Sequence, residues 1–267
     1  MNTSFQTLVV ELDSGILTVF FNREKQKNAL SLQMVDELEA VLQEAVQDSK
    51  VRAIFLRGKG KHFCAGGDIK DMAKARMGKS EGADPIAVLN RRFGALINAF
   101  YRCPKTVVAI VQGAAMGGGF GLACIADVVV AHKTAKFKLP ETSLGVPPAQ
   151  IAPFLVYRLG MAKAKRLALT GASITGHQAV DVGLVDMLVD DDTIVPAVDD
   201  LKTRILRCAP QASQVTKQLF LSIADTEQNA LLDQGAQLFA EAVRSGEGME
   251  GMMAFLQKRN PSWVVKR

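Results

Sequence analysis

The chain has 267 residues, of which 48% are hydrophobic and 22% are charged. This length and apolar fraction suit one large domain or two unequal ones, and they exclude an intrinsically disordered protein. Lysine and arginine number 32 against 27 aspartates and glutamates, so the net charge is +5. Because the excess is small and no run of five like charges occurs, we expect binding of small anions rather than of nucleic acid.

The four cysteines lie far apart and include no CxxC pair; they are Cys64, Cys103, Cys124 and Cys208. This spacing predicts neither a zinc knuckle nor a disulfide framework, and it favours a reducing compartment. The first six residues lack the basic and apolar segments of a secretory signal. We therefore expect a cytoplasmic protein.

The first part of the chain alternates predicted strands and helices. Thr7–Leu12 and Ile16–Phe21 flank a short turn and predict a hairpin. Ser31 precedes apolar residues at helical spacing, so it is the expected N-cap of a helix. Val51–Arg57 predicts a buried strand and Ile86–Phe100 a helix, whereas the intervening residues 70–80 are polar and predict no core element.

The segment Thr106–Ala126 contains no charged residue and is long enough to cross a bilayer. Its five glycines and Gln112 argue for a different arrangement. We predict a strand over Thr106–Val111, a turn at Gly117–Gly119 and a short buried helix over Phe120–Ala126.

The remaining pattern sets the fold class and the domains. Asp127–Ala131 predicts a third strand, and strands that alternate with helices favour a parallel sheet in an α/β fold. After Pro140 the pattern changes, and from Ile151 onward the period is helical, apart from a short strand near Met187–Val189. We divide the chain into a core domain, residues 1–194, and a C-terminal helical region, residues 195–267.

Two glycine-rich loops each follow a predicted strand, at residues 63–68 and 112–119. Glycine permits close approach of the backbone, and two N–H groups from different loops could converge to form an oxyanion hole. The alternative is that these glycines only pack at tight turns. Neither loop has the sequence of a phosphate-binding P-loop or of a dinucleotide fingerprint.

Glu141 is a single carboxylate in an apolar loop bounded by prolines. Such surroundings raise the pKa of a carboxyl group and suit it to proton transfer near neutral pH. The alternative is a surface glutamate that stabilises the start of a helix. The three histidines, His62, His132 and His177, are interpreted as surface or capping residues, and Cys64 as a packing residue.

These features in this order resemble the crotonase (enoyl-CoA hydratase/isomerase) superfamily. The matching segments are Asn22-Arg23, Asn28-Ala29-Leu30, Phe63–Lys70, Val111–Gly119, Ala126-Asp127, Pro140-Glu141, Gly145, Glu250-Gly251-Met252, Phe255 and Lys258-Arg259. The resemblance implies a crotonase-like spiral of ββα repeats with a C-terminal helical trimerisation region. It also implies an acyl-CoA substrate, a homotrimer or dimer of trimers, no membrane association, no metal, and no cofactor other than the coenzyme A of the substrate.

The resemblance also assigns roles to individual residues. The backbone N–H groups of Gly67 and Gly118 correspond to the oxyanion hole, and Glu141 to a catalytic glutamate. The family's second glutamate falls on Gly121, which departs from the pattern. Residues expected to bind the substrate or its coenzyme A are Arg23, Lys25, Ala65, Asp68, Ile69, Lys70, Phe255 and Lys258. The last two belong to the C-terminal helical region, which a neighbouring subunit can supply.

A closer resemblance, in residues 117–122, 140–141 and 144–154, is to bacterial methylglutaconyl-CoA and isohexenylglutaconyl-CoA hydratases. It implies hydration of a 3-branched 2-enoyl-CoA, for which one carboxylate can suffice. The alternatives are a Δ3,Δ2-enoyl-CoA isomerase and a non-catalytic protein that binds acyl-CoA, or RNA through its basic surface. A substrate with a distal carboxylate would need a cation in the acyl pocket, for which Arg91, Arg92 and Arg158 are candidates, although all three are expected at the surface.

Overall fold

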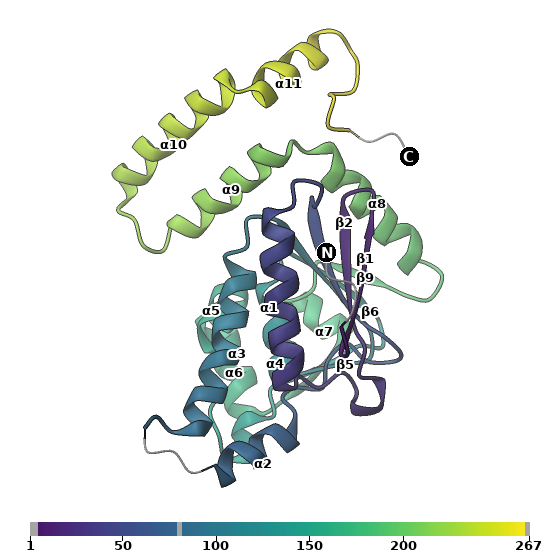
Figure 1. The fold of residues 1–267 in the computed structure, drawn as a ribbon, viewed down its shortest axis with the longest axis vertical. Helices are drawn as coiled ribbons and strands as arrows, with labels where there is room; N and C mark the ends of the chain where they lie inside the picture. The colour runs from purple at the N-terminus through teal and green to yellow at the C-terminus, as the bar shows by residue number, and fades with distance from the viewer. Residues whose placement is uncertain (1–4, 79–81, 265–267) are drawn as a thin grey trace.

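The computed structural model describes residues 5–78 and 82–264. Its centre is a six-stranded sheet in the order β1-β2-β3-β4-β6-β9 (Figure 1). β1 and β2 form the predicted antiparallel hairpin, and the later pairings in this sheet are parallel. The strands are β1 (Leu8–Asp13), β2 (Ile16–Phe21), β3 (Ala53–Gly58), β4 (Thr106–Val111), β6 (Val128–His132) and β9 (Met187–Val189). The predicted α/β fold class is confirmed.

A second sheet has three strands in the order β5-β7-β8. They are β5 (Ala114–Met116), β7 (Lys136–Lys138) and β8 (Ser173–Thr175). The sequence did not predict these strands, because three residues are too few to show a period. The chain passes from β4 into β5 at Gly113, where φ is +60° and a β-carbon would lie 2.0 Å from the Lys61 carbonyl oxygen. Only glycine fits this turn between the two sheets.

Two of the α-helices before β4 cover one face of the large sheet. α1 (Leu32–Gln47) begins as predicted at Ser31, whose hydroxyl accepts a hydrogen bond from the Met34 N–H at 3.2 Å. α3 (Pro85–Tyr101) lies where a helix was expected. α2 (Ile69–Met77) was not predicted, because it buries no residue and so shows no apolar stripe. It is capped by Asp68, which accepts a hydrogen bond from the Lys70 N–H at 2.8 Å.

The inner strands of the large sheet are buried on both faces. One face packs Leu17, Ile54 and Val107 against α1, α3 and α4 within the main core cluster. The other face packs Phe55 and Val108 against α8 in a second cluster. Because both faces are covered, β3 and β4 consist of continuous apolar runs rather than alternating ones.

The charge-free segment forms β4, β5 and α4 (Gly118–Ile125). Seven of the eight residues of α4 are buried, which explains the absence of charge. No helix in the described part of the chain is both long and apolar enough to cross a membrane. The predicted strand and buried helix are therefore present, but α4 begins at Gly118, two residues before the predicted start at Phe120.

The second half of the chain is mostly helical. Its helices are α5 (Ala152–Leu159), α6 (Met161–Thr170), α7 (Gly176–Asp181), α8 (Ile194–Arg207), α9 (Pro210–Ser222), α10 (Gln228–Arg244) and α11 (Gly246–Leu256). α8 packs Ile194, Leu201 and Leu206 on the sheet. α9 and α10 bury no residue, and α10 with α11 extends away from the sheet as an arm, drawn in yellow-green in Figure 1.

Candidate active site

The first glycine loop, residues 63–67, is held by two isolated parallel bridges, Cys64 to Ala115 and Gly67 to Leu30. In the second bridge Leu30 donates to the Gly66 carbonyl at 2.8 Å and accepts from the Asp68 N–H at 2.9 Å. In a parallel bridge the flanking residues make both bonds, so the N–H of Gly67 points away from Leu30. It finds no acceptor within residues 5–78 and 82–264.

The second glycine loop leads into α4. Gly117 has φ 50° and ψ −115°, and the helix starts at the next residue. Gly118 is therefore in the first helical turn, where an N–H has no intrahelical acceptor. In the part of the chain that the structure describes, this N–H is not bonded to any other group. The early start of α4 also places the positive end of the helix dipole at Gly118.

The two loops lie against each other. A β-carbon on Gly117 would lie 3.8 Å from the Cα atom of Gly66, and one on Gly66 would lie 3.2 Å from the Met116 carbonyl oxygen. The structure therefore brings Gly67 and Gly118, each with a free N–H, to adjoining loops. Two such donors can hold the negative oxygen that develops on a polarised carbonyl.

Glu141 lies beside this pair of loops. It is the first residue of the short 3-10 helix η2 (Glu141–Leu144), directly after Pro140. Its Oε1 atom lies 3.0 Å from the position that a β-carbon on Gly117 would take. Its Oε2 atom is buried and has no hydrogen-bond partner among the described residues. Burial raises the pKa of the Glu141 carboxyl group above its usual value, which brings it closer to the range where a carboxyl group can both take up and release a proton.

Apolar side chains cover the same loops. A β-carbon on Gly118 would lie 2.9 Å from Cζ of Phe93 and 3.1 Å from Cδ1 of Leu30. The Cε methyl of Met72 lies 2.6 Å from the corresponding position on Gly67. Neither residue was predicted from the sequence, because Phe93 has the helical spacing of a core residue and Met72 lies in α2, which itself was not predicted. They give the site a low-polarity surface, which strengthens interactions with charge.

Gly121, where the family pattern has a glutamate, is buried in α4. A β-carbon there would lie only 2.4 Å from Cγ2 of Ile151 and 3.6 Å from Cδ1 of Ile97. The position is therefore occupied by other side chains and is not an empty space. Ile151 belongs to the loop between η2 and α5, within the segment 144–154 that carries the closer resemblance, but its position beside Gly121 was not predicted.

Two of the residues expected to bind the substrate pair with each other. Arg23 Nη2 lies 2.6 Å from Asp68 Oδ2, and Asp68 is 8% exposed. Arg23 also donates to the carbonyl oxygen of Ala29. Burial alone would raise the pKa of Asp68, but hydrogen bonds from Arg23 and from the Lys70 N–H hold it below its usual value. These two side chains fix the loop that carries Gly67.

The other expected coenzyme A contacts fall at two places. Lys25, in the 3-10 helix η1 (Glu24–Gln26), is exposed, as are Ile69 and Lys70 at the start of α2. Ala65 is partly exposed in the glycine loop and donates its N–H to the Lys27 carbonyl at 3.1 Å.

Phe255, 83% exposed, and Lys258 belong to the arm, at the opposite end of the molecule from α2 (Figure 1). One chain therefore does not bring these two residues to the glycine loops.

Two residues that were expected at the surface, His132 and Arg158, are largely buried. His132 is 7% exposed at the end of β6, where Nδ1 lies 2.7 Å from the Thr134 hydroxyl. Arg158 is largely buried and pairs with Asp186 at 2.5 Å. Arg92 is paired with Asp36, whereas Arg91 is exposed on α3. Because Arg158 and Arg92 already have carboxylate partners, neither is a free cation for a distal carboxylate.

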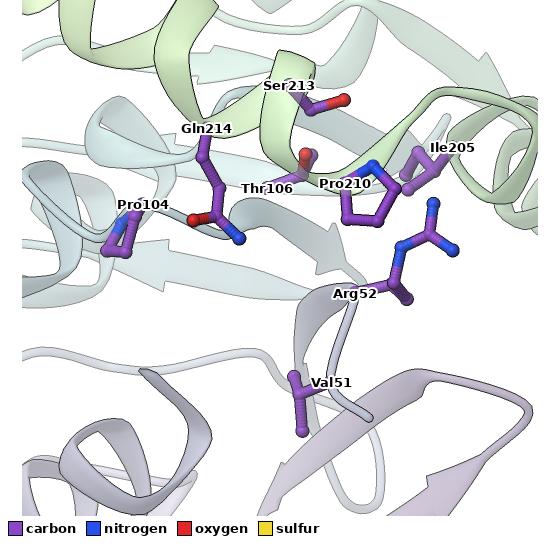
Figure 2. Close-up of a pocket in the computed structure, with 8 residues that line it drawn as sticks. All are labelled: Val51, Arg52, Pro104, Thr106, Ile205, Pro210, Ser213 and Gln214. Atoms are coloured by element: carbon purple, nitrogen blue, oxygen red, sulfur yellow. The ribbon is translucent and has the colours of Figure 1, made fainter. Parts of the chain in front are cut away.

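A small cleft lies at the other end of the sheet. Its lining residues come from the starts of β3 and β4 and from α8 and α9 (Figure 2). Its volume of about 10 Å³ is no more than a single water requires. The described residues also include no cluster of side chains with the composition of a metal site. The adjoining glycine loops with Glu141 are the candidate active site, because they combine two backbone donors with a buried carboxyl group.

Comparison with known proteins agrees with this geometry. The model of the enoyl-CoA hydratase/isomerase family matches residues 11–266. The chain is 33% identical to the 2,3-dehydroadipyl-CoA hydratase of Escherichia coli, over 96% of this chain and 98% of that protein. The solved structure of Pseudomonas aeruginosa AtuE is 49% identical, with a TM-score of 0.94 over 97% of this chain and all of the other.

A second solved structure, an enoyl-CoA hydratase/isomerase from Marinobacter aquaeolei, is 46% identical. Its TM-score is 0.95 over 97% of this chain and all of the other chain. These matches cover both the sheets and the C-terminal helices, so the fold is the crotonase fold. The chain therefore belongs to the enoyl-CoA hydratase/isomerase family and is an enzyme of that class.

Proposed function

We propose that the protein hydrates a 2-enoyl-CoA thioester, preferentially a 3-branched one, with Glu141 as its single general acid and base. The observation that carries this proposal is the Glu141 carboxyl group, whose Oε1 lies beside the start of α4 and whose buried Oε2 has no hydrogen-bond partner in the described part of the chain. An unpaired buried carboxylate is costly to the fold and is typical of sites where a proton must be exchanged.

The proposed reaction begins with the thioester carbonyl between the N–H groups of Gly67 and Gly118. Their hydrogen bonds draw electron density onto the oxygen and stabilise the enolate that forms. The Glu141 carboxylate takes a proton from water as the hydroxyl oxygen bonds to C3. The protonated Glu141 then gives this proton to C2, and the carbonyl double bond is restored. The net change is the addition of one water molecule.

The preference for a branch follows from the single carboxylate. In a two-carboxylate site two groups could share the work of holding water and moving its proton. In this protein Gly121 supplies no second carboxylate, and the side chains next to it are the apolar Ile151 and Ile97. A second alkyl group on C3 stabilises positive charge there as water adds, so it lowers the demand on the one base.

A second candidate is Δ3,Δ2-enoyl-CoA isomerisation, which the same observation supports. One carboxylate can carry a proton between C2 and C4 without activating water, and the apolar surface of Phe93 and Leu30 would disfavour water at the site. The two reactions give different products from different substrates, so they can be separated directly.

The deciding experiment is a panel of linear 2-enoyl, 3-branched 2-enoyl and 3-enoyl thioesters of coenzyme A. Loss of the conjugated enoyl absorbance reports hydration, and its gain from a 3-enoyl thioester reports isomerisation. The proposal expects the highest kcat/KM for hydration of the 3-branched substrate. Turnover of the 3-enoyl thioester alone would favour the isomerase, and faster hydration of the linear substrate would contradict the branched preference.

Binding of the coenzyme A phosphates is proposed for the exposed Lys25 and Lys70, beside the loop that Arg23 and Asp68 fix. Phe255 and Lys258 reach a bound coenzyme A only from another subunit. We therefore also propose self-association as a homotrimer or a dimer of trimers. The arm supports it, because Leu232, Phe239 and Phe255 are more than 60% exposed in the single chain.

A further inference from the structure

Ile151 occupies the space that a side chain at Gly121 would need. A β-carbon on Gly121 would lie 2.4 Å from Cγ2 and 3.2 Å from Cβ of Ile151. Ile151 is 3% exposed and also lies beside Ile97 of α3. Gly121 and Ile151 are therefore complementary: because Gly121 has no side chain, the Ile151 side chain can pack against α4 at this position.

This pair lies beside the candidate oxyanion hole. Helical side chains point toward the N-terminus of their helix and cover the preceding turn. A side chain at position 121 would therefore cover Gly117 and Gly118, the turn against which Glu141 Oε1 lies. Ile151 takes the place of a side chain at position 121, so it forms one wall of the space beside Gly118 and Glu141.

The loop that carries Ile151 is firmly attached to α3. The neighbouring Gln150 donates from Nε2 to the Asn90 side-chain oxygen at 2.8 Å. Its Oε1 atom lies 1.8 Å from the position that a β-carbon on Gly94 would take, so its amide lies directly on the helix backbone. The Ile151 N–H donates to the Pro148 carbonyl at 3.2 Å. With these contacts, Ile151 cannot swing away from α4 without breaking the attachment.

We propose that Ile151 is a specificity-determining residue that keeps a second acid–base group out of the site and limits the room for the acyl branch. The inference rests on the proposed function, because it takes Glu141 and Gly118 as the borders of the reacting space. An apolar wall accepts an alkyl branch, and its size sets how large that branch can be.

The first test changes only the size of the wall. Ile151→Val removes one methylene group and preserves the fold, so its effect can be measured on 3-methyl and 3-ethyl 2-enoyl thioesters. We expect the kcat/KM for the 3-ethyl substrate, divided by that for the 3-methyl substrate, to rise about 10-fold. This is the lower end of the discrimination that one methylene group provides. Leu169→Val, at an exposed position of α6, is the matched control and should leave the ratio unchanged. An unchanged ratio in Ile151→Val would overturn the proposal.

The second test restores a carboxylate. Gly121→Glu alone should lower Tm, whereas Gly121→Glu with Ile151→Ala should regain the Tm of Ile151→Ala. The double variant should hydrate a linear 2-enoyl thioester about 100-fold faster than Gly121→Gln with Ile151→Ala, since general acid–base catalysis contributes at least that factor. Equal rates for the Glu and Gln variants, or an unaltered Tm in Gly121→Glu alone, would contradict the inference.

Failure of this inference and failure of the proposed function give different results. Failure of the wild-type protein to hydrate any 3-branched thioester would reject the proposed function itself. A wild-type enzyme that hydrates them, but whose branch ratio does not respond to Ile151, would reject only the role of Ile151.

Discussion

Arg23 and Asp68 form an ion pair of 2.6 Å between the end of the β1–β2 hairpin and the residue that follows Gly67. Only 18% of the Arg23 side chain and 9% of the Asp68 side chain is exposed. Asp68 also caps α2, so one carboxylate fixes the start of that helix and the end of the glycine loop. The position of the Gly67 N–H therefore depends on a charge pair that does not itself reach the candidate oxyanion hole.

Asp68→Asn should lower the free energy of unfolding by about 3 kcal/mol, because it leaves a buried guanidinium without its counter-charge. The amide can still cap α2, so the loss reports the ion pair. Asp84→Asn is the control, since Asp84 caps α3 in the same way through Ile86 N–H and its carboxylate pairs with no cation among the described residues. Chemical denaturation of both variants measures the difference.

The same pair predicts an acid dependence. Because the pKa of Asp68 is lower folded than its unfolded value of 3.8, its contribution is complete above that value. As the pH falls from about 4 toward the lower folded pKa, the unfolded state takes up the proton first and stability is lost until the folded carboxyl group is protonated as well. Denaturation midpoints of the wild type and Asp68→Asn should therefore converge over this interval. Parallel curves would show that the pair does not contribute.

Glu141→Gln should reduce kcat by a factor of about 100 or more, since it removes the only proposed acid–base group. The amide has nearly the same shape, so the affinity for a saturated acyl-CoA, measured by calorimetry, should stay within a few-fold. Glu11→Gln, at an exposed position on β1, is the matched control. Full turnover by Glu141→Gln would reject both hydration and isomerisation as proposed.

Glu141→Gln should also stabilise the fold at neutral pH. Burial raises the folded pKa of Glu141 above the unfolded value of 4.5, so below that value both states are protonated and the wild type bears no penalty. As the pH rises through 4.5, the unfolded state loses its proton first and wild-type stability falls until the folded pKa is passed. The Tm of the variant minus that of the wild type should therefore grow with pH. A difference independent of pH would mean that the carboxylate is not destabilised by burial.

Gly118→Pro tests the backbone donor itself. Proline is tolerated in the first helical position and lacks an N–H, so α4 can still form. Gly118→Ala is the matched control, because both variants place a β-carbon against Phe93 and Leu30 but only alanine keeps the N–H. We expect kcat for the proline variant to lie about 100-fold below that of the alanine variant. Equal values would indicate that this N–H does not stabilise the reacting oxygen.

The sequence predicted those parts of the site that local patterns determine. β4, the glycine loops and Glu141 could be found because charge-free runs, glycine clusters and an isolated carboxylate are visible along the chain. Ile151 and Phe93 could not be found in this way, because they are ordinary apolar residues whose role depends on which helix they face. α2 was missed since it buries nothing, although Asp68 before Ile69 was a capping signal.

Which charged residues are buried could not be predicted from the sequence either. Arg158 was expected at the surface because an arginine near a helix end usually is, yet it lies between Asp186 and the carbonyl oxygens of Leu184 and Ala126. Asp186 comes from a different part of the chain, and no local pattern joins the two. The tertiary fold alone decides that this cation is already paired.

The arm offers a last prediction, on assembly. Leu232 and Phe239 are seven residues apart on α10, which places them on one face, and they are 64% and 73% exposed in the single chain. Phe239→Glu would put a charge into the proposed subunit interface, so light scattering should show a shift from trimer or hexamer toward monomer. Gln237→Glu adds the same charge at an exposed position about 200° away around the helix, and it should leave the mass unchanged. Because Phe255 and Lys258 are proposed to reach a neighbour's coenzyme A, KM for the thioester should rise with dissociation. A monomeric Phe239→Glu variant with unaltered KM would separate assembly from substrate binding and reject the shared site.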